Sequence, residues 1–553
     1  MRLFLCKMVL NSTMVNSKFL LFYLIITNFV LIFILLFSEL NQTLTSFFGM
    51  LILSFPVGFV SIHYFKKKSY SSSVIIVTSI IFGFVLNSLW SVSSSYFLIH
   101  PIITLIPYLI TNGILFYYQI TKYLSANSVE SNNYNFESFT KFTKNDIFFL
   151  VFIFISMILF VSITYYYTEP IDTGDLGRYH VPISEDFLKF SKVDLSLVNQ
   201  GKGYGYPIGF HSNVASYSNL FHIDPNLMSQ TFILFLLYLV FVVFTTVSYV
   251  LSRSLIISIS VMTSFFFIPE VDYWTSLFGT IFPGLGPYLL GLLYALTGLL
   301  LLILIKQKNN FLFFITLISL FLGIVYVYPP FIIYFGFGVL FYLIIQYGKI
   351  KTKTIDLVKD LQFFKLRNFN FLHMLFGLII FNTFFNRVYE ISLHIIKSAD
   401  PINGAIGYSN SYIYKSNPDS EFFLVFAIII IFVGLFYFKS SKLIACILFS
   451  ITIIPSVVIF FLPLDVYFVP FKVSLLIPIF SWFLVGIFIR ELNDRLIQNE
   501  FVNTVKSFKN SILTIVINYH VLSVSFLIAS LIFFGSNILD IFDLNSYYYQ
   551  GMK

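Results

Sequence analysis

The sequence predicts an all-α protein that crosses a membrane many times. Hydrophobic residues make up 58% of the 553 residues, and the mean hydropathy is +0.88, far above that of a soluble domain. Apolar runs of about 18 or more residues recur along the whole chain, and each is long enough to cross a hydrocarbon core of about 30 Å. Because lipid offers the backbone no hydrogen-bonding partner, these spans must be helices.

About fifteen spans are predicted. The first apolar run lacks a small-residue cleavage site, so we expect a retained helix and not a signal peptide. The predicted spans are residues 19–38, 46–65, 73–91, 96–118, 147–167, 228–251, 255–269, 283–305, 311–328, 331–347, 371–395, 421–438, 443–462, 473–489 and 511–535.

Basic residues predict the orientation of these spans. With the N-terminus in the cytoplasm, the cytoplasmic loops hold 24 of the 33 Lys and Arg residues and the outer loops hold 8, while Arg387 lies in a span. This asymmetry follows the positive-inside rule. We therefore expect a multi-pass protein of the cell membrane with an extracytoplasmic C-terminus. The net charge of +8 reflects topology, and no nucleic-acid partner is expected.

The longest outer loop, residues 168–227, is long enough to be functional. A short amphipathic helix is expected over 180–190, with Ile183, Phe187 and Phe190 on one face, and a second short helix over 211–222. Both are expected to lie on the membrane surface. Before the second helix, G-K-G-Y-G-Y-P-I-G-F-H forms a glycine-rich turn that ends in an aromatic and proline platform.

The same loop opens with T-E-P-I-D-T-G-D-L-G-R-Y-H, residues 168–180. Asp172 and Asp175 are three positions apart, and Arg178 and His180 follow. A carboxylate at an apolar boundary has a raised pKa and makes an effective general base. The alternative is structural, with Asp172 in a turn and Asp175 as a helix cap.

A second acidic segment, F-I-P-E-V-D-Y-W at 267–274, lies in the next outer loop. Glu270 and Asp272 are candidates to orient an acceptor hydroxyl or to bind a metal, although a solvated Glu270 is the simpler alternative. Two carboxylates do not specify a metal. A divalent cation (Mg or Mn) held by Asp175, Glu270 and Asp272 is therefore left open, and no cofactor is predicted with certainty.

Two cationic residues are candidate phosphate contacts. Arg387 lies in the span 371–395, where an ionisable side chain is costly and points to function. Its planar guanidinium suits a phosphate, but a structural pair with Glu390 three residues later is an equal alternative. Lys202 lies between two glycines and is the second candidate, with a freely exposed lysine as its alternative.

This order of motifs resembles the GT-C superfamily of integral-membrane glycosyltransferases. Members similar to the protein mannosyltransferases and the lipid A aminoarabinose transferases carry Asp-Glu-x-x-Tyr in the first outer loop, often with Arg before the Tyr. The chain has D-L-G-R-Y, which matches at Asp175, Arg178 and Tyr179 and departs at Leu176. Y-P-I-G-F-H, residues 206–211, is similar to a Tyr-Pro-x-Gly-x-His segment of arabinofuranosyltransferase-like proteins.

The resemblance covers roughly 147–395 and implies a polyprenyl-phosphate-linked sugar as donor and a cell-envelope glycan, lipid or protein as acceptor. Asp175 would be the catalytic base, with Asp172 as the alternative. Taken together, the predicted substrate-binding residues are Arg178, Tyr179, His180, Lys202, Tyr206, His211, Glu270, Asp272 and Arg387.

The chain would then have three parts. Residues 1–146 would form an N-terminal bundle of about four helices with a cytoplasmic linker. Residues 147–395 would form the GT-C-like catalytic module with outer loops 168–227 and 270–282. Residues 396–553 would form an outer loop and a C-terminal bundle.

Two other classes stay open. A polysaccharide polymerase or ligase that uses lipid-linked glycans would share much of this architecture, but it usually needs several outer-facing arginines. A transporter or flippase of lipid-linked glycans would be expected to carry ionisable residues or broken helices at mid-membrane. The predicted spans are nearly free of charge, which favours the monosaccharide transferase.

Overall fold

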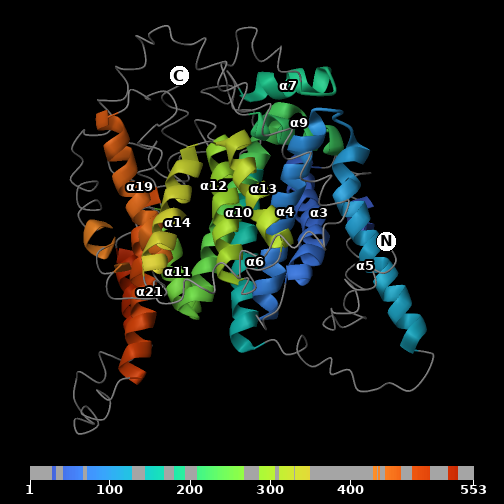
Figure 1. Ribbon diagram of the computed structural model, residues 1–553. Helices are drawn as coiled ribbons and strands as arrows, with labels where there is room; N and C mark the ends of the chain where they lie inside the picture. The colour runs from blue at the N-terminus through green and yellow to red at the C-terminus, as the bar shows by residue number, and fades with distance from the viewer. Residues whose placement is uncertain are drawn as a thin grey trace. The chain divides into compact units, whose positions relative to one another are not determined.

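The computed structural model shows a helical protein (Figure 1). Nearly all described residues lie in helices, and no strand occurs among them, which confirms the all-α prediction for this part of the chain. The structure describes residues 28–32, 41–65, 71–126, 143–166, 180–193, 208–266, 286–304, 311–328, 330–348, 427–431, 434–435, 442–461, 476–498 and 521–532.

Five described helices are long and apolar enough to cross a membrane. They are α3 (Gln42–Phe65), α4 (Ser72–Ser95), α6 (Lys144–Tyr166), α10 (Pro225–Ser252) and α12 (Gly286–Leu304). Each coincides with a predicted span, so a helical membrane protein is what this part of the chain forms. The total of about fifteen spans, the three-part division and the orientation stay predictions.

The other long helices also lie on predicted apolar runs. They are α5 (Pro101–Ala126), α13 (Phe311–Val327), α14 (Pro330–Gly348), α19 (Lys442–Phe461) and α21 (Leu476–Gln498). The predicted span 255–269 differs, because its α-helix, α11 (Leu255–Thr263), has nine residues and passes into the 3-10 turn η4 (Ser264–Phe266). At about 1.5 Å per residue, nine residues are too few to cross a bilayer.

The chain divides into two compact units. The first contains the described residues up to Val243 and those from Gly286 to Tyr328. The second contains Phe244–Phe266 and the described residues from Pro330 onwards. The long helix α10 therefore contributes to both.

The first unit is built on a close crossing of α3 and α4. A Cβ added to Gly58 would overlap the backbone oxygen of Ser79, and a Cβ added to Gly83 would overlap that of Ser54. Each helix thus presents a serine and a glycine four residues apart, the small-xxx-small pattern that lets membrane helices approach closely. Asn87 adds a hydrogen bond from Nδ2 to the oxygen of Leu53 on α3, at 3.1 Å.

The N-terminal ends of α4 and α6 meet at one end of this unit. Asp146, in the first turn of α6, accepts from the Oγ of Ser73 on α4 and from the backbone N and Oγ1 of Thr143. The amide of Asp146 donates in return to Thr143 Oγ1, at 3.2 Å, which completes a capping box. A carboxylate is favoured where two helix N-termini converge.

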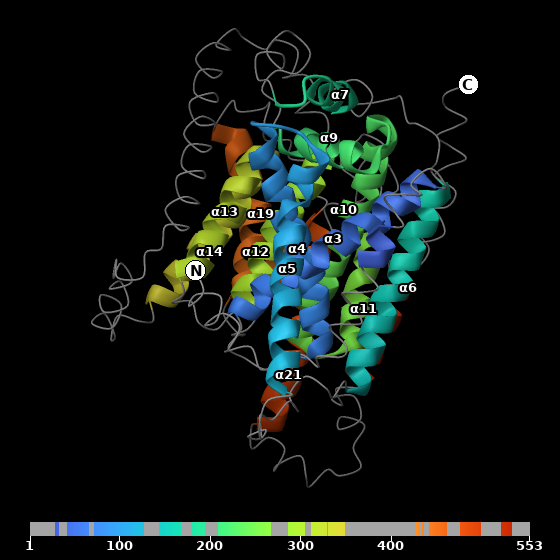
Figure 2. The ribbon, with the colours of Figure 1, turned by 90° about the vertical axis from the view of Figure 1, so that its right-hand side faces the viewer.

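α4 also contacts the short helix α9 (Gly209–Phe221), and a second short helix, α7 (Val181–Lys189), packs on α9. α4 has 24 residues, so its ends are about 36 Å apart. Figures 1 and 2 show α7 lying across α9, at the end of the unit away from the start of α6. This end carries the described part of the predicted outer loop.

Both short helices occur where the sequence predicts them, with two differences. α7 ends at Lys189, so Phe190 lies in the following turn with 43% of its surface exposed, while Ile183 and Phe187 are buried as expected. The expected position of α9 on the membrane surface is wrong. All its residues but Asn219 are buried, because it is packed against α3, α4, α5, α12 and α13.

The second unit contains two further tight helix contacts. α14 crosses α19 at Gly338, where an added Cβ would lie 2.8 Å from the Cα of Ile447. The helical residues 521–532 pack on α21, where Trp482 stacks on Phe526 and donates from Nε1 to Ser530 Oγ at 2.8 Å.

The α3–α4 crossing predicts a clear difference between glycines. Gly58→Ala and Gly83→Ala should each lower the thermal stability of the detergent-purified protein, because overpacking typically costs about 1–3 kcal/mol and here the obstacle is backbone. Gly113→Ala on α5 is the matched control, since its Cβ would meet nothing within 4 Å. Melting temperatures that fall equally for all three variants would contradict the close crossing.

Candidate functional site

The structure describes two of the residues that the sequence predicts for the site, His180 and His211. The others lie outside the described residues, and their roles stay predictions: Asp172, Asp175, Arg178, Tyr179, Lys202, Tyr206, Glu270, Asp272 and Arg387. His180 directly follows the predicted motif D-L-G-R-Y, and His211 is the last residue of Y-P-I-G-F-H. The site is therefore built up from them.

His180 is held at the start of α7. It occupies the N-cap position, and Pro182 follows in the first turn, where the missing amide hydrogen leaves no helix bond unmade. Ser184 donates from Oγ to the backbone oxygen of His180 at 2.9 Å. Since Val181 and Phe187 are buried, α7 is anchored by its apolar side and the imidazole is fixed at its N-terminal end.

His211 lies in the first turn of α9. Two glycines allow this turn to pack closely against neighbouring helices. A Cβ on Gly209 would lie 2.6 Å from Val327 Cγ2 and 2.9 Å from the backbone oxygen of Tyr326. A Cβ on Gly286, at the start of α12, would overlap the ring of Phe210. The glycines therefore bring the start of α9 against α12 and α13.

The two imidazoles hydrogen-bond each other. His180 Nδ1 lies 2.8 Å from His211 Nε2, and the ring centroids are 5.0 Å apart at 34°. His180 is 1% exposed and His211 is fully buried. Phe210 closes the pair with edge-on contacts to both rings, at 5.5 Å and 5.7 Å, and itself packs on Phe232 of α10.

This geometry limits the charge of the histidine pair. One ring nitrogen must donate and the other must accept, so at least one imidazole is neutral at the shared contact. A doubly protonated pair would place two donors face to face in a buried site. The pair is therefore suited to orient the two chain segments that run into it, or to hold a single added proton.

The end of α7 is joined to the turn between α4 and α5. The amide of Ile99 donates to the oxygen of Ser191 at 2.6 Å, and the amide of Val193 donates to that of Ser95 at 2.8 Å. Asn219 of α9 donates from Nδ2 to the oxygen of Ile99 at 3.2 Å. Both short helices are thus fixed to the same turn, which keeps the histidine pair on a rigid base.

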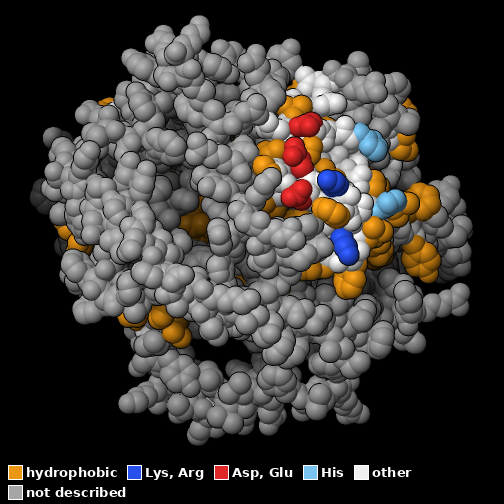
Figure 3. Space-filling model, turned by 90° about the horizontal axis from the view of Figure 1, so that it is seen from above, with side chains coloured by type: hydrophobic (Ala, Val, Ile, Leu, Met, Phe, Trp, Pro, Cys, Tyr) orange, Lys and Arg blue, Asp and Glu red, His pale blue; other side chains and the backbone are white. Residues whose placement is uncertain are grey.

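Charged side chains gather around α7 at this end. Burial raises the pKa of Glu185, and the neighbouring Asp224 and Asp186 raise it further. Figure 3 shows that acidic and basic side chains both lie on this face.

His222 and Asp224 have structural roles next to the site. His222 ends α9 in a left-handed conformation with φ 55°. Asp224 accepts from the amide of Asn226 at 2.9 Å, which caps the start of α10.

A buried polar contact lies between α4 and α12 of the same unit. Ser88 Oγ lies 2.6 Å from the hydroxyl of Tyr294, and both side chains are buried. Tyr217 of α9 is close to Tyr294, and burial raises the pKa of the Tyr217 phenol, so its hydroxyl stays neutral. These contacts link α9 to the spanning helices.

No metal centre is found within the described ranges, where no three His, Cys, Asp or Glu side chains come together. The three carboxylates named for a divalent cation lie outside these ranges, so that alternative stays open.

The described residues therefore form a helical membrane protein that has a buried histidine pair at one end of its first unit. No protein-family model, curated protein or solved structure matches the chain.

The hydrogen bond between the histidines is not predictable from the sequence. The sequence motifs assign both residues to substrate binding separately, and they are 31 positions apart. The sequence indicates only that each histidine lies at or near the start of a predicted short helix.

A double-mutant cycle tests the histidine pair. His180→Ala and His211→Ala should each cost about 1–3 kcal/mol of unfolding free energy, because each removes the hydrogen-bond partner of a buried polar ring. The double variant should cost less than the sum, with a coupling of at least about 0.5 kcal/mol. Thermal or denaturant unfolding of the purified protein measures this. Exposed His100→Ala is the matched control, and fully additive losses would contradict the contact.

Glu185 predicts a pH dependence of stability. Its folded-state pKa is raised, so the folded protein binds the proton more tightly than the unfolded chain. The contribution of Glu185 is therefore most favourable below its usual range and is lost as the pH rises through the raised pKa. Glu185→Gln should be more stable than wild type at pH 7, and the difference should shrink on acidification. Parallel melting-temperature curves would refute this.

Proposed function

We propose that this protein is a membrane glycosyltransferase. It moves a sugar from a polyprenyl-phosphate-linked donor to a cell-envelope acceptor at the extracytoplasmic face. One observation carries the proposal, the buried hydrogen bond between His180 and His211. It joins the residue that directly follows D-L-G-R-Y to the last residue of Y-P-I-G-F-H, and both histidines are predicted substrate-binding residues.

The hydrogen bond supports a single site because it limits how far the motifs can separate. Asp175 precedes His180 by five residues, and Tyr206 precedes His211 by five. Five residues reach at most about 18 Å. Asp175 in the first motif and Tyr206 in the second can each be no farther than this from the histidine pair, which supports the proposal of one site.

In the proposed reaction, Asp175 is the general base. The acceptor hydroxyl oxygen attacks the anomeric carbon and forms the new glycosidic bond, while the bond from that carbon to the phosphate oxygen breaks. The hydroxyl proton passes to the Asp175 carboxylate, and the bond electrons leave with the polyprenyl phosphate. Asp172 is the alternative base if the motif aligns three residues earlier.

Cationic side chains would bind the leaving phosphate. Arg178 is two residues before His180, so the histidine pair would orient it together with Tyr179. Arg387 and Lys202 are the further phosphate contacts, and Glu270 and Asp272 would orient the acceptor. His180 and His211 are positioning residues in this scheme, because they would fix the chain segments that carry the reacting groups.

The placement of α7 and α9 supports an outer site. The start of α6 meets the start of α4, through Asp146 and Ser73, whereas the turn that follows α7 meets the end of α4, through Val193 and Ser95. The two chain segments that flank α6 therefore lie at opposite ends of α4. The distribution of basic residues assigns the α7 end to the extracytoplasmic side.

The charge content of the spans favours a transferase over a transporter. The five candidate spans carry no Asp, Glu, Lys or Arg except Lys144 and Asp146, both at the start of α6. A transport pathway through them would be expected to carry ionisable groups at mid-membrane.

Cell-envelope glycans test the proposal. Cells that carry Asp175→Asn should lose the glycan modification made by wild type, because removal of a general base typically slows a reaction about 10²–10⁴-fold. Asp172→Asn tests the alternative register, and Asp186→Asn on α7 is the matched control. Glycan composition is compared at equal protein levels. Unchanged glycans in both motif variants would overturn the catalytic proposal.

A further inference from the structure

An exposed patch of apolar and basic side chains lies beside α7. It consists of Phe97 and Leu98, in the turn between α4 and α5, and Lys189, Phe190 and Lys192, at the end of α7. Phe97 is 77% exposed, Leu98 42% and Phe190 43%, and both lysines are exposed. We call this set the outer-end patch.

The outer-end patch is a built feature, because two chain segments far apart in sequence form it together. The paired backbone bonds Ile99 N to Ser191 O and Val193 N to Ser95 O join the α4–α5 turn to the end of α7. Ser191 reverses the chain with a left-handed φ of 53°. The two segments therefore present their exposed side chains from one joined turn.

The patch lies at the level where the membrane surface is expected. α4 ends at Ser95, and α5 begins at Pro101. The lipid-facing side of α5 starts immediately beyond the turn, with Ile102 61% exposed, Leu109 54% and Phe116 52%. Exposed Phe and Leu continue this apolar side to its end, which is typical of residues that enter the acyl boundary of a bilayer.

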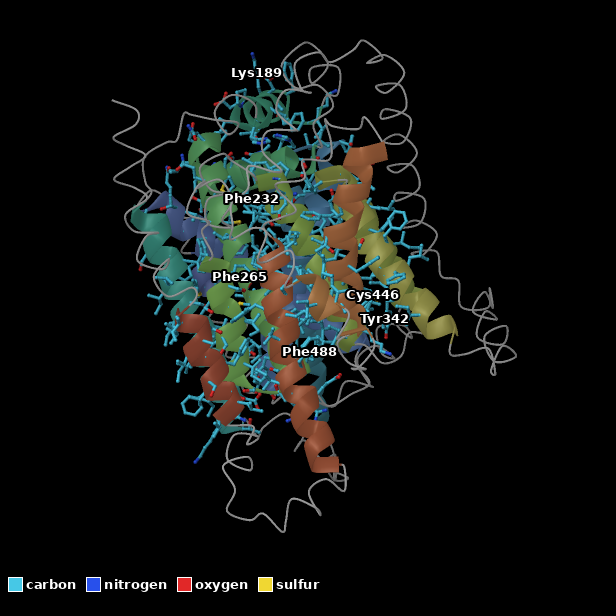
Figure 4. All side chains as sticks on the ribbon, turned by 90° about the vertical axis from the view of Figure 1, so that its left-hand side faces the viewer. Lys189, Phe232, Phe265, Tyr342, Cys446 and Phe488 are labelled. Carbon is cyan, nitrogen blue, oxygen red and sulfur yellow. The ribbon has the colours of Figure 1, made fainter. Side chains whose placement is uncertain are left out.

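The charges of the patch are basic only. Lys189 Nζ lies 5.8 Å from the ring centroid of Phe190, and Figure 4 shows Lys189 pointing away from the helices. The acidic Glu185, Asp186 and Asp224 lie close to one another, and Figure 3 shows acidic and basic side chains next to one another on this face. Two ammonium groups above exposed apolar side chains complement a layer of phosphate above acyl chains.

We propose that the outer-end patch binds the headgroups of anionic phospholipids in the leaflet at this end of the protein. Lys189 and Lys192 contact the phosphates, and Phe97, Leu98 and Phe190 insert beside the acyl chains. The proposal does not depend on glycosyl transfer. It gives the loop that contains the histidine pair a fixed height relative to the membrane surface.

Native mass spectrometry of the full-length protein in detergent tests the proposal. The probe is phosphatidylglycerol, with phosphatidylcholine as the zwitterionic reference. Wild type should bind phosphatidylglycerol more tightly than phosphatidylcholine. Because a basic residue at the surface of an anionic membrane contributes roughly 1 kcal/mol, each lysine should account for about a fivefold factor in affinity. Lys189→Gln/Lys192→Gln should thus lose about 25-fold.

Two further variants keep the test decisive. Lys189→Arg/Lys192→Arg retains the charge and should bind like wild type. Lys144→Gln removes an exposed lysine at the start of α6, at the other end of the unit, and should leave this affinity unchanged. Inorganic phosphate should compete weakly, since it lacks acyl chains. Equal phosphatidylglycerol binding by wild type and the double Gln variant, or equal loss in Lys144→Gln, would overturn the proposal.

Discussion

The absence of hydrogen-bonding partners in the hydrocarbon interior governs this structure. Backbone groups within a span must bond inside their own helix, and many hydroxyls do the same. Ser79 donates to the oxygen of Ile75, Thr231 to that of Leu227, and Thr297 to that of Leu293. Polar contacts between different helices are therefore specific links. The α3–α4 crossing combines one such contact, from Asn87 to Leu53, with close backbone approach at glycine.

The histidine pair is one of these links, and it lies where the chain leaves the spanning helices. In a flexible loop, the positions of the side chains would vary. Here α9 is buried within the unit and α7 is joined to the α4–α5 turn. The described part of the outer loop is thus a rigid support, which is what a reactive group needs in order to keep its geometry.

Helix positions could be predicted well from the sequence, and helix environments could not. The apolar runs locate α6, α10 and α12 within a few residues, because length and hydrophobicity alone decide a span. The sequence predicts a position on the membrane surface for α9, a short helix that contains the polar residues Ser212, Asn213 and Ser218. These polar residues are buried, and only tertiary packing against neighbouring helices decides that.

The candidate site, like the helices, was predictable only in part. Residue types in the motifs predict His180 and His211 as candidate site residues, and the chemistry of those motifs stays a prediction. The contact between the two histidines could not be predicted, since 31 residues separate them and one sequence contains no information on which loop positions meet. The sequence also does not reveal why residues 209 and 286 are glycines. The structure shows that neighbouring side chains leave no room for a Cβ at either position.

The lipid-linked sugar pool of living cells tests the central claim most directly. The claim is that this protein consumes a polyprenyl-phosphate-linked sugar. Lipid extracts of cells without the active protein should therefore contain more of one such lipid than extracts of wild-type cells, as mass spectrometry would show. An unchanged set of polyprenyl-phosphate sugars, with the protein present in one strain and absent in the other, would contradict the account.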